Sequence, residues 1–404
     1  MKTFLKHAFR VGILLTLFIA PTQLSWQPRP KFNLSLADVT LALTAGVWLL
    51  DVALRREWRR LRPPPCVQVL FVAVAGLSFF VAQDKAFAVK DIVQLVEFFI
   101  VGHLLFAAFL REHEGALWQS LSVLLAATAI NIGIAVAQYF KADVDVMKVC
   151  GTFGNRNVLG GYLALALPLA AGALLGARQV WVKAVLGLVL AAGLLVNLSG
   201  ASYFAAAGVL ACMAARRGHK VFIPVAVCLL AVQMFVLPNL PRVNDMVHFR
   251  SLALYDDEGR VERRYPDWQA AYDMTLNHPW LGVGMGNYQK RVGQYYNSIP
   301  RQTGPSEADI QNLYLVLAAS AGLPALLLFV VFLSGAVRQA RSAAAHGTGL
   351  RAGLGLGASG ALVAFAFTAV WHPLLVRGIG LPLVFVLALA QVLATRESGI
   401  SNGS

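Results

Sequence analysis

Amide and cationic side chains gather directly before an apolar run that begins at Val158. The segment Cys150-Gly-Thr-Phe-Gly-Asn-Arg-Asn157 places Asn155, Arg156 and Asn157 where a helix is predicted to begin. Amide and guanidinium donors at a helix N-terminus suit phosphate or sugar oxygens, so these three residues are substrate-binding candidates. The alternative is that Asn157 only caps the helix and that Arg156 extends to an interface.

A second group of charged side chains lies further along the chain. Arg250, Arg263 and Arg264 share a short stretch with several carboxylates. Arginine forks match the geometry of a diphosphate, which makes these residues candidate diphosphate ligands. The alternative is a solvated cluster whose charges neutralise one another.

Alternating glycines follow in the segment from Asn277 to Tyr288, NHPWLGVGMGNY. No strand pattern precedes them and no GK[ST] follows, so the segment predicts an elbow that returns the chain to a bilayer rather than a nucleotide loop. His278 is a candidate for substrate binding or for a general base, with a purely structural role as the alternative.

Gln311 and Asn312 open the next apolar run. Polar residues at the mouth of a helix bundle indicate a cavity, whereas helix capping by Asp309 or Asn312 is the alternative. His372 and Arg377 are candidates for the same cavity, or for anchoring at the interface.

Metal and cofactor motifs are sparse. The Asp143-Val-Asp145 pattern is short enough to arise by chance, and the four cysteines are scattered. No metal site, disulfide framework or cofactor is predicted.

The composition indicates which elements position these groups. With 58% hydrophobic and 13% charged residues, the chain is predicted to be an all-α polytopic membrane protein. Its apolar runs of roughly 17 to 22 residues match helices that span a bilayer. The formal net charge of +14 is explained by basic residues at helix ends, so no nucleic-acid partner is predicted.

About twelve membrane-spanning helices are predicted. They are Val11–Leu24, Leu36–Leu54, Cys66–Val81, Ile92–Leu110, Leu117–Phe140, Val158–Leu175, Val185–Leu198, Tyr203–Ala215, Val221–Leu237, Leu313–Leu333, Ala352–Val370 and Leu381–Ala394. Basic residues concentrate in alternate connections, which predicts that both termini are cytoplasmic.

The polar segment Pro238–Asp309 is predicted to form one large external loop. The chain then divides into a bundle at 1–237, a loop at 238–310 and a second bundle at 311–404. Within the loop, Asp267–His278 is predicted to be an amphipathic helix that begins near Pro266. Its apolar face would be formed by Trp268, Ala271, Tyr272 and Thr275.

Four of these features together resemble the O-antigen ligase and O-antigen polymerase superfamily of bacterial envelope glycosyltransferases. They are GTFGNRN before the sixth helix, the large loop, RRYPDW followed by NHPWLGVGMGNY within it, and QNLYLVLAASAGL after it. The resemblance covers roughly Cys150 to Leu333 and implies a GT-C-like fold in the bacterial inner membrane.

The resemblance implies transfer of a glycan from an undecaprenyl diphosphate carrier at the periplasmic face, without a metal. The acceptor would be lipid A core or a growing polysaccharide, and membrane lipid surrounds the site. Arg264, four positions before Trp268, matches the family arginine that binds the diphosphate.

Two positions depart from the family pattern. The histidine proposed to activate the acceptor falls at Gln311, and a Ser-Arg pair is replaced within Ser199–Tyr203. Glutamine cannot act as a general base, so Gln311 and Asn312 would position the acceptor while Arg264 stabilises the leaving diphosphate. His278 or His372 would supply a base if one is needed.

Two other functions are also compatible with the sequence. A transporter or flippase also has about twelve helices, although such proteins usually carry ionisable groups near the bilayer midplane. A non-catalytic family member that binds the carrier lipid is the other alternative.

Overall fold

The computed structural model describes residues 2–22, 25–29, 32–112, 115–141, 149–216, 260–296 and 311–398. Within these ranges the chain is built from helices and one short hairpin. Six helices are long and apolar enough to cross a membrane: Leu36–Arg55, Lys85–Glu112, Gly115–Tyr139, Arg156–Gly176, Leu313–His346 and Gly349–Thr368. The protein is therefore a helical polytopic membrane protein. The predicted ninth span, Val221–Leu237, lies outside the described residues, and each of the other eleven overlaps a helix.

The N-terminal helix starts earlier than the sequence predicted. α1 runs from Lys2 to Ile19 rather than over Val11–Leu24. Leu5, Phe9 and Ile13 recur every four residues and are buried, so one helical face packs from the first turns onward. The ring of Phe9 lies 6.2 Å from that of Trp48.

An antiparallel hairpin follows α1, which the all-α prediction did not include. Strand β1 (Ser25–Arg29) pairs with β2 (Phe32–Ser35). Ser35 then caps α2 (Leu36–Arg55) in a capping box with Asp38. A short 3-10 turn, η1 (Trp58–Arg60), leads to α3 (Cys66–Leu77) and the 3-10 turn η2 (Ser78–Phe80).

The next membrane helix is interrupted by a wide turn. It consists of α4 (Lys85–Val96), the π-helix η3 (Glu97–Gly102) and α5 (His103–Glu112). The Gln68 amide in α3 donates to the Phe99 carbonyl at 2.6 Å, and its nitrogen lies 3.2 Å from His103 Nδ1. Side chains thus supply partners at the point where the regular helix spacing changes.

The second half of the bundle is centred on two closely packed helices. α7 (Arg156–Gly176) lies against α14 (Gly349–Thr368), and a Cβ on Gly172 would be 2.3 Å from the Gly353 carbonyl oxygen. Such close backbone contact is typical of small residues between membrane helices. The neighbouring helices are α6 (Gly115–Tyr139), α8 (Val180–Val196), α9 (Gly200–Arg216) and α15 (Gly380–Ser398).

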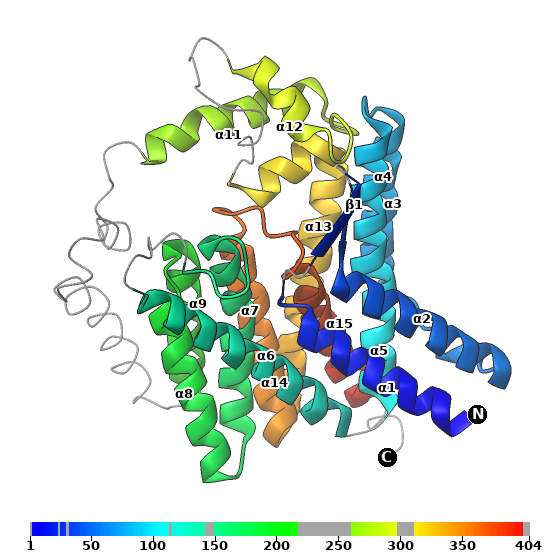
Figure 1. Ribbon diagram of the computed structural model, residues 1–404, viewed down its shortest axis with the longest axis vertical. Helices are drawn as coiled ribbons and strands as arrows, with labels where there is room; N and C mark the ends of the chain where they lie inside the picture. Colours follow the sequence, from blue (N-terminus) through cyan, green and yellow to red (C-terminus); the bar gives the residue numbers. More distant parts are fainter. Residues whose placement is uncertain are drawn as a thin grey trace.

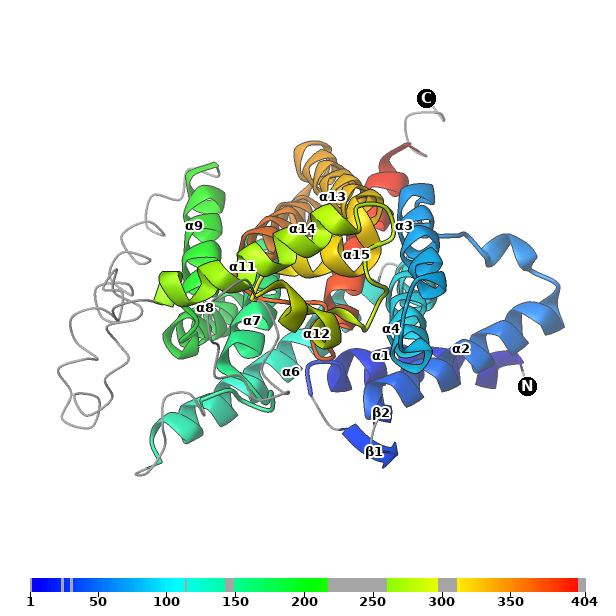
Figure 2. The ribbon, with the colours of Figure 1, turned by 90° about the horizontal axis from the view of Figure 1, so that it is seen from above.

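One amphipathic helix lies across an end of the bundle. Figures 1 and 2 show α11 (Arg260–Asn277) crossing this end, beside α12 (Tyr288–Arg291) and the 3-10 turn η8 (Val292–Tyr295).

The helix predicted over Asp267–His278 is confirmed, with two corrections. α11 begins at Arg260 and continues through Pro266, which is therefore inside the helix rather than at its start. Ala271 and Thr275 are buried as predicted, together with Ala270 and Met274, whereas Tyr272 is 52% exposed.

The helix after the loop is longer than predicted and contains a break. α13 extends from Leu313 to His346, whereas the sequence predicted an end near Leu333. Gly322 has φ 88° inside it, and Pro324 follows two residues later. The two parts of α13 therefore meet at a kink, which lies where the loop contacts the helix.

Candidate functional site

The kink in α13 exchanges backbone hydrogen bonds with the glycine-rich elbow. The Val283 and Gly284 N–H groups donate to the carbonyls of Ala319 and Ser320 at 2.8 and 3.0 Å. In return the Leu323 N–H donates to the Pro279 carbonyl at 2.8 Å. Position 324 is a proline without an N–H, so the Ser320 carbonyl has no donor at its usual helical position.

Glycine is required on both sides of this contact. A Cβ on Gly322 would lie 2.1 Å from the Trp280 carbonyl oxygen, and one on Gly282 would lie 2.4 Å from that of Ala319. Both glycines also have positive φ, 88° and 62°. The elbow predicted from the sequence is thus present and is fitted to α13.

The same elbow is fixed to the turn between α3 and α4. Asn287 is fully buried, and its amide accepts from the Asp84 N–H at 2.7 Å and donates to the Asp84 carbonyl at 3.1 Å. The Met285 N–H donates to the Ser78 hydroxyl at 3.0 Å. These contacts hold the C-terminal end of α11 against two separate helices of the bundle.

The first turn of α13 is fixed to the end of α14. The Leu313 N–H donates to the Ala369 carbonyl at 2.8 Å, and the Tyr314 hydroxyl donates to that of Ala366 at 2.8 Å. Asn312 is buried and caps α13 by accepting from the Leu315 N–H at 3.1 Å. Helix capping was one of the two interpretations of this residue from the sequence. Gln311 is partly buried and directly precedes this cap.

A buried Ser–His contact lies beside that turn. His372 Nε2 is 3.2 Å from the Ser199 hydroxyl, which also accepts from the Ser202 hydroxyl at 3.3 Å. All three side chains are buried. A Cβ on Gly160, in the first turns of α7, would be 2.6 Å from Ser199 Cβ, so α7 also adjoins this cluster.

A tryptophan pair connects this cluster to α11. The rings of Trp268 and Trp371 lie 5.7 Å apart. Trp268 is four residues after Arg264 on α11, and Trp371 directly precedes His372. The contact therefore sets the position of α11 over the turn that carries His372.

The segment before α7 is held by side chains of α6. Gln138 Oε1 accepts from the N–H groups of Cys150 and Gly151 at 2.9 and 2.8 Å. Asn131 Oδ1 accepts from the Thr152 hydroxyl at 2.6 Å. Burial raises the pKa of the Cys150 thiol, which keeps it protonated near neutral pH.

Asn155 rather than Asn157 caps α7. The Asn155 side chain accepts from the Asn157 N–H at 2.7 Å, because the chain turns into the helix one residue after Asn155. Asn155 is exposed, and Arg156 and Asn157 are partly buried. All three lie within the first turn of α7, next to the turn at Gly160 that contacts Ser199.

The arginine candidates are described only in part. Arg250 lies outside the described residues. Arg263 and Arg264 lie in the first turns of α11, and their side chains are outside the described part of the structure.

His278 directly follows α11; its N–H donates to the Met274 carbonyl, and its own carbonyl accepts from the Gly282 N–H at 3.0 Å.

Arg377 forms an ion pair with a carboxylate of α2. Its Nε lies 2.9 Å from a carboxylate oxygen of Asp38, which is buried at the start of α2. The turn between α14 and α15 therefore contacts the turn before α9 through His372 and the start of α2 through Arg377. Local sequence spacing does not indicate either contact, because each joins residues far apart in the chain. The sequence does show a polar side chain within an apolar region at both positions, and this signal identified His372 as a candidate.

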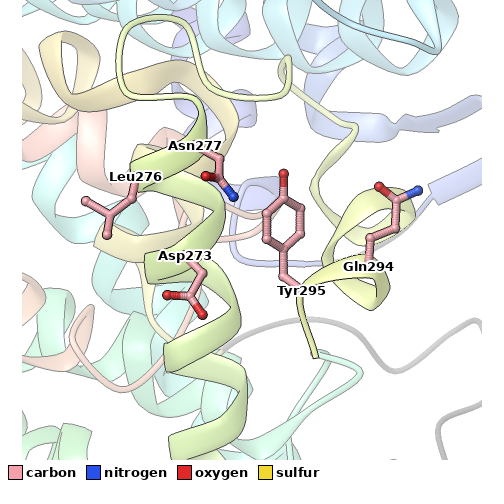
Figure 3. Close-up of a pocket in the computed structure, with 5 residues that line it drawn as sticks. All are labelled: Asp273, Leu276, Asn277, Gln294 and Tyr295. Atoms are coloured by element: carbon pink, nitrogen blue, oxygen red, sulfur yellow. The ribbon is translucent and has the colours of Figure 1, made fainter. Parts of the chain in front are cut away.

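A shallow hollow on the surface of α11 is lined mainly by polar side chains. It has a volume of about 380 Å³ and lies between α11 and η8. Figure 3 shows Asn277 on α11 facing the ring of Tyr295, with Asp273 one turn away. The described residues that line it include the carboxylate of Asp273 and the amides of Asn277 and Gln294.

Among the residues that the structure describes, no three His, Cys, Asp or Glu side chains are grouped as a metal site would need. Asp143 and Asp145 lie outside those residues.

The fold defines a polytopic helical membrane protein in which a loop helix, α11, packs across one end of the bundle. Residues 185–330 match the family model described as O-antigen ligase, which confirms the resemblance to the O-antigen ligase family over this segment. The matched segment includes α11, the elbow and the kink of α13. No curated protein matches the chain. The family indicates ligase-like or polymerase-like processing of glycans at a membrane.

Proposed function

We propose that this protein transfers a glycan from an undecaprenyl diphosphate carrier to an acceptor at the periplasmic face of the inner membrane. The acceptor is lipid A core or a growing polysaccharide. The observation that carries the proposal is the docking of α11, which bears Arg264, onto the kink of α13, whose first turn follows Gln311 and Asn312. The family match over the same segment supports it.

In the proposed reaction, an acceptor hydroxyl attacks the anomeric carbon and the bond to the diphosphate oxygen breaks with inversion. Negative charge grows on the diphosphate as it leaves. Arg264 stabilises this charge, together with Arg263, Arg250 and Arg156. This step needs no metal, because guanidinium groups can supply the positive charge.

The acceptor side of the site is formed by the start of α13. Gln311 and Asn312 position the hydroxyl, and Asn155 and Asn157 offer amide groups to the sugar. Glutamine cannot accept the proton that the hydroxyl loses.

We assign the proton to His372 rather than to His278. His372 lies next to the backbone contact between Leu313 and Ala369, whereas His278 closes α11 at the elbow. Ser199 lies 3.2 Å from Nε2 and therefore fixes the ring, and the acceptor proton passes to the imidazole of His372 as the new glycosidic bond forms.

The test is transfer by the purified protein from radiolabelled undecaprenyl diphosphate oligosaccharide. The reaction is run with and without lipid A core, and with and without EDTA. Arg264→Ala should reduce transfer by about 10²-fold or more, as removal of a transition-state donor does. Arg341→Ala, an exposed arginine near the far end of α13, is the matched control and should leave the rate unchanged.

The product distinguishes the candidate activities. Label on lipid A core despite EDTA identifies a ligase, and a ladder on the carrier identifies a polymerase. Carrier binding without transfer by the wild-type protein would contradict the proposal and favour the non-catalytic or transporter alternatives.

A further inference from the structure

A second cavity borders the first turns of α13 on the side of α4. It has a volume of about 370 Å³ and is enclosed by α4, the elbow with α12, α13 and the turn before α15. Pockets for small ligands typically measure about 300–1,000 Å³. The cavity therefore has room for one end of a lipid, and the remainder would lie in the bilayer.

The lining of this cavity is amphiphilic. Leu313, Leu317 and Phe98 form an apolar wall and are buried. Lys90 and Lys290 supply ammonium groups, although Asp91 also contributes to the lining. Such a lining matches an apolar chain that ends in an anionic group.

The two lysines are not equivalent. Lys290 forms an ion pair with Asp84 at 2.5 Å and lies over the ring of Phe87. Lys90 is partly buried, and it makes no ion pair or hydrogen bond with the residues that the structure describes. Lys90 is therefore the cation that an incoming anion can engage without breaking an existing pair.

The cavity and the Ser–His contact lie on two sides of one turn. The Leu313 side chain lines the cavity, while its N–H bonds to Ala369, three residues before His372. Pro373, which also lines the cavity, directly follows His372. A lipid held here would thus lie against the first turn of α13, which Gln311 and Asn312 directly precede.

We propose that this cavity binds the phosphorylated lipid end of the acceptor, a site separate from the diphosphate site on α11. The proposal rests on the proposed function, because it requires two lipid-linked substrates. Both acceptors considered above carry phosphate on an apolar anchor. The shared chemistry is a lipid phosphate, and the experiment separates its sources.

The experiment measures equilibrium binding of radiolabelled undecaprenyl phosphate and of lipid A to the full-length protein in phosphatidylcholine nanodiscs. Lys90→Glu should weaken binding of the preferred lipid by about tenfold or more, because it replaces the attractive charge with a repulsive one. Lys90→Arg should retain binding. Lys85→Glu on the same helix is the matched control, since the Lys85 ammonium donates to the carbonyls of Phe79 and Phe80 outside the cavity.

A second variant tests the apolar wall. Leu317→Trp should fill the cavity and weaken binding of the same lipid, and comparison of its unfolding temperature with that of the wild type shows whether it folds. In the transfer assay, Lys90→Glu should raise KM for the acceptor with little change in kcat. Preference for lipid A or for undecaprenyl phosphate would name the acceptor, and either preference supports the proposal.

Two results would overturn it. Equal binding by wild type and Lys90→Glu would exclude the cavity as the phosphate site. Equal competition by phosphatidylglycerol would make it a site for bulk lipid. Because binding is measured without turnover, these results are distinct from a failure of the wild type to transfer glycan, which would contradict the proposed function instead.

Discussion

His372 and Ser199 are 173 positions apart in the chain, yet the imidazole Nε2 lies 3.2 Å from the serine hydroxyl in a buried cluster. The contact joins the turn after α14 to the turn before α9. It occurs next to the first turn of α13, where the resemblance to the O-antigen ligases leads us to expect a histidine at the position of Gln311. His372 brings a histidine to this turn from another part of the chain.

The proposed role of His372 predicts a specific loss of turnover. His372→Gln should lower kcat by about 10²-fold or more, as expected when a general base is removed, with little change in KM for the donor. His278→Gln is the control and should retain most activity. Steady-state transfer kinetics provide the measurement, and equal effects of the two substitutions would argue against the assignment.

The position of Ser199 predicts that a methyl group on Gly160 is costly. Gly160→Ala would place Cβ 2.6 Å from Ser199 Cβ and should destabilise the protein by about 1–3 kcal/mol. Gly187→Ala is the matched control, because nothing lies within 4 Å of a Cβ there. Thermal unfolding in detergent should show a lower Tm for the first variant only.

The contact between the elbow and α13 predicts that Gly322 controls the docking of α11. Gly322→Ala adds a Cβ 2.1 Å from the Trp280 carbonyl oxygen, at a residue whose φ is 88°. Amides of the elbow should then exchange hydrogen faster, since their acceptors on α13 are displaced. Hydrogen exchange with mass spectrometry tests this. Gly335→Ala, in the same helix with nothing within 4 Å, should leave exchange unchanged.

The ion pair between Asp38 and Arg377 predicts that the two residues contribute to the free energy of unfolding in a non-additive way. Removing either partner leaves a largely buried charge and should cost about 3–5 kcal/mol, whereas the double variant should be less destabilised than the sum. A double-mutant cycle of Asp38→Asn and Arg377→Gln, measured by unfolding free energies, gives the coupling. Additive effects would show that the pair is not energetically linked.

The sequence predicted the helices better than their ends. Apolar runs located α2 and α14 well, because burial in lipid or protein needs continuous hydrophobicity. α13 runs past its predicted end because its last turns, up to His346, mix alanine with charged and polar residues, which favours a helix without forming a continuous apolar run. The hairpin was missed because Pro28 argues against a strand, and the pairing shifts register between Trp26 and Arg29 near it.

The site was predictable only where its signal was local. Capping of α13 by Asn312 follows from its place before an apolar run. The contacts of Asn287 with Asp84 and of His372 with Ser199 join distant parts of the chain, and spacing in one sequence carries no information on such pairs. The sequence nominated His372 as a candidate but could not supply its partner.

The break in α13 has a consequence for how the protein is assembled in the cell. Without the elbow, the Ser320 carbonyl lacks a donor, because position 324 is a proline, and an unpaired backbone group in a bilayer costs several kcal/mol. The elbow is synthesised before α13, so it is available when the helix inserts. Membrane insertion of this helix and folding of the loop should therefore be one cooperative event, and a chain split between the elbow and α13 should assemble only if the two pieces meet during synthesis.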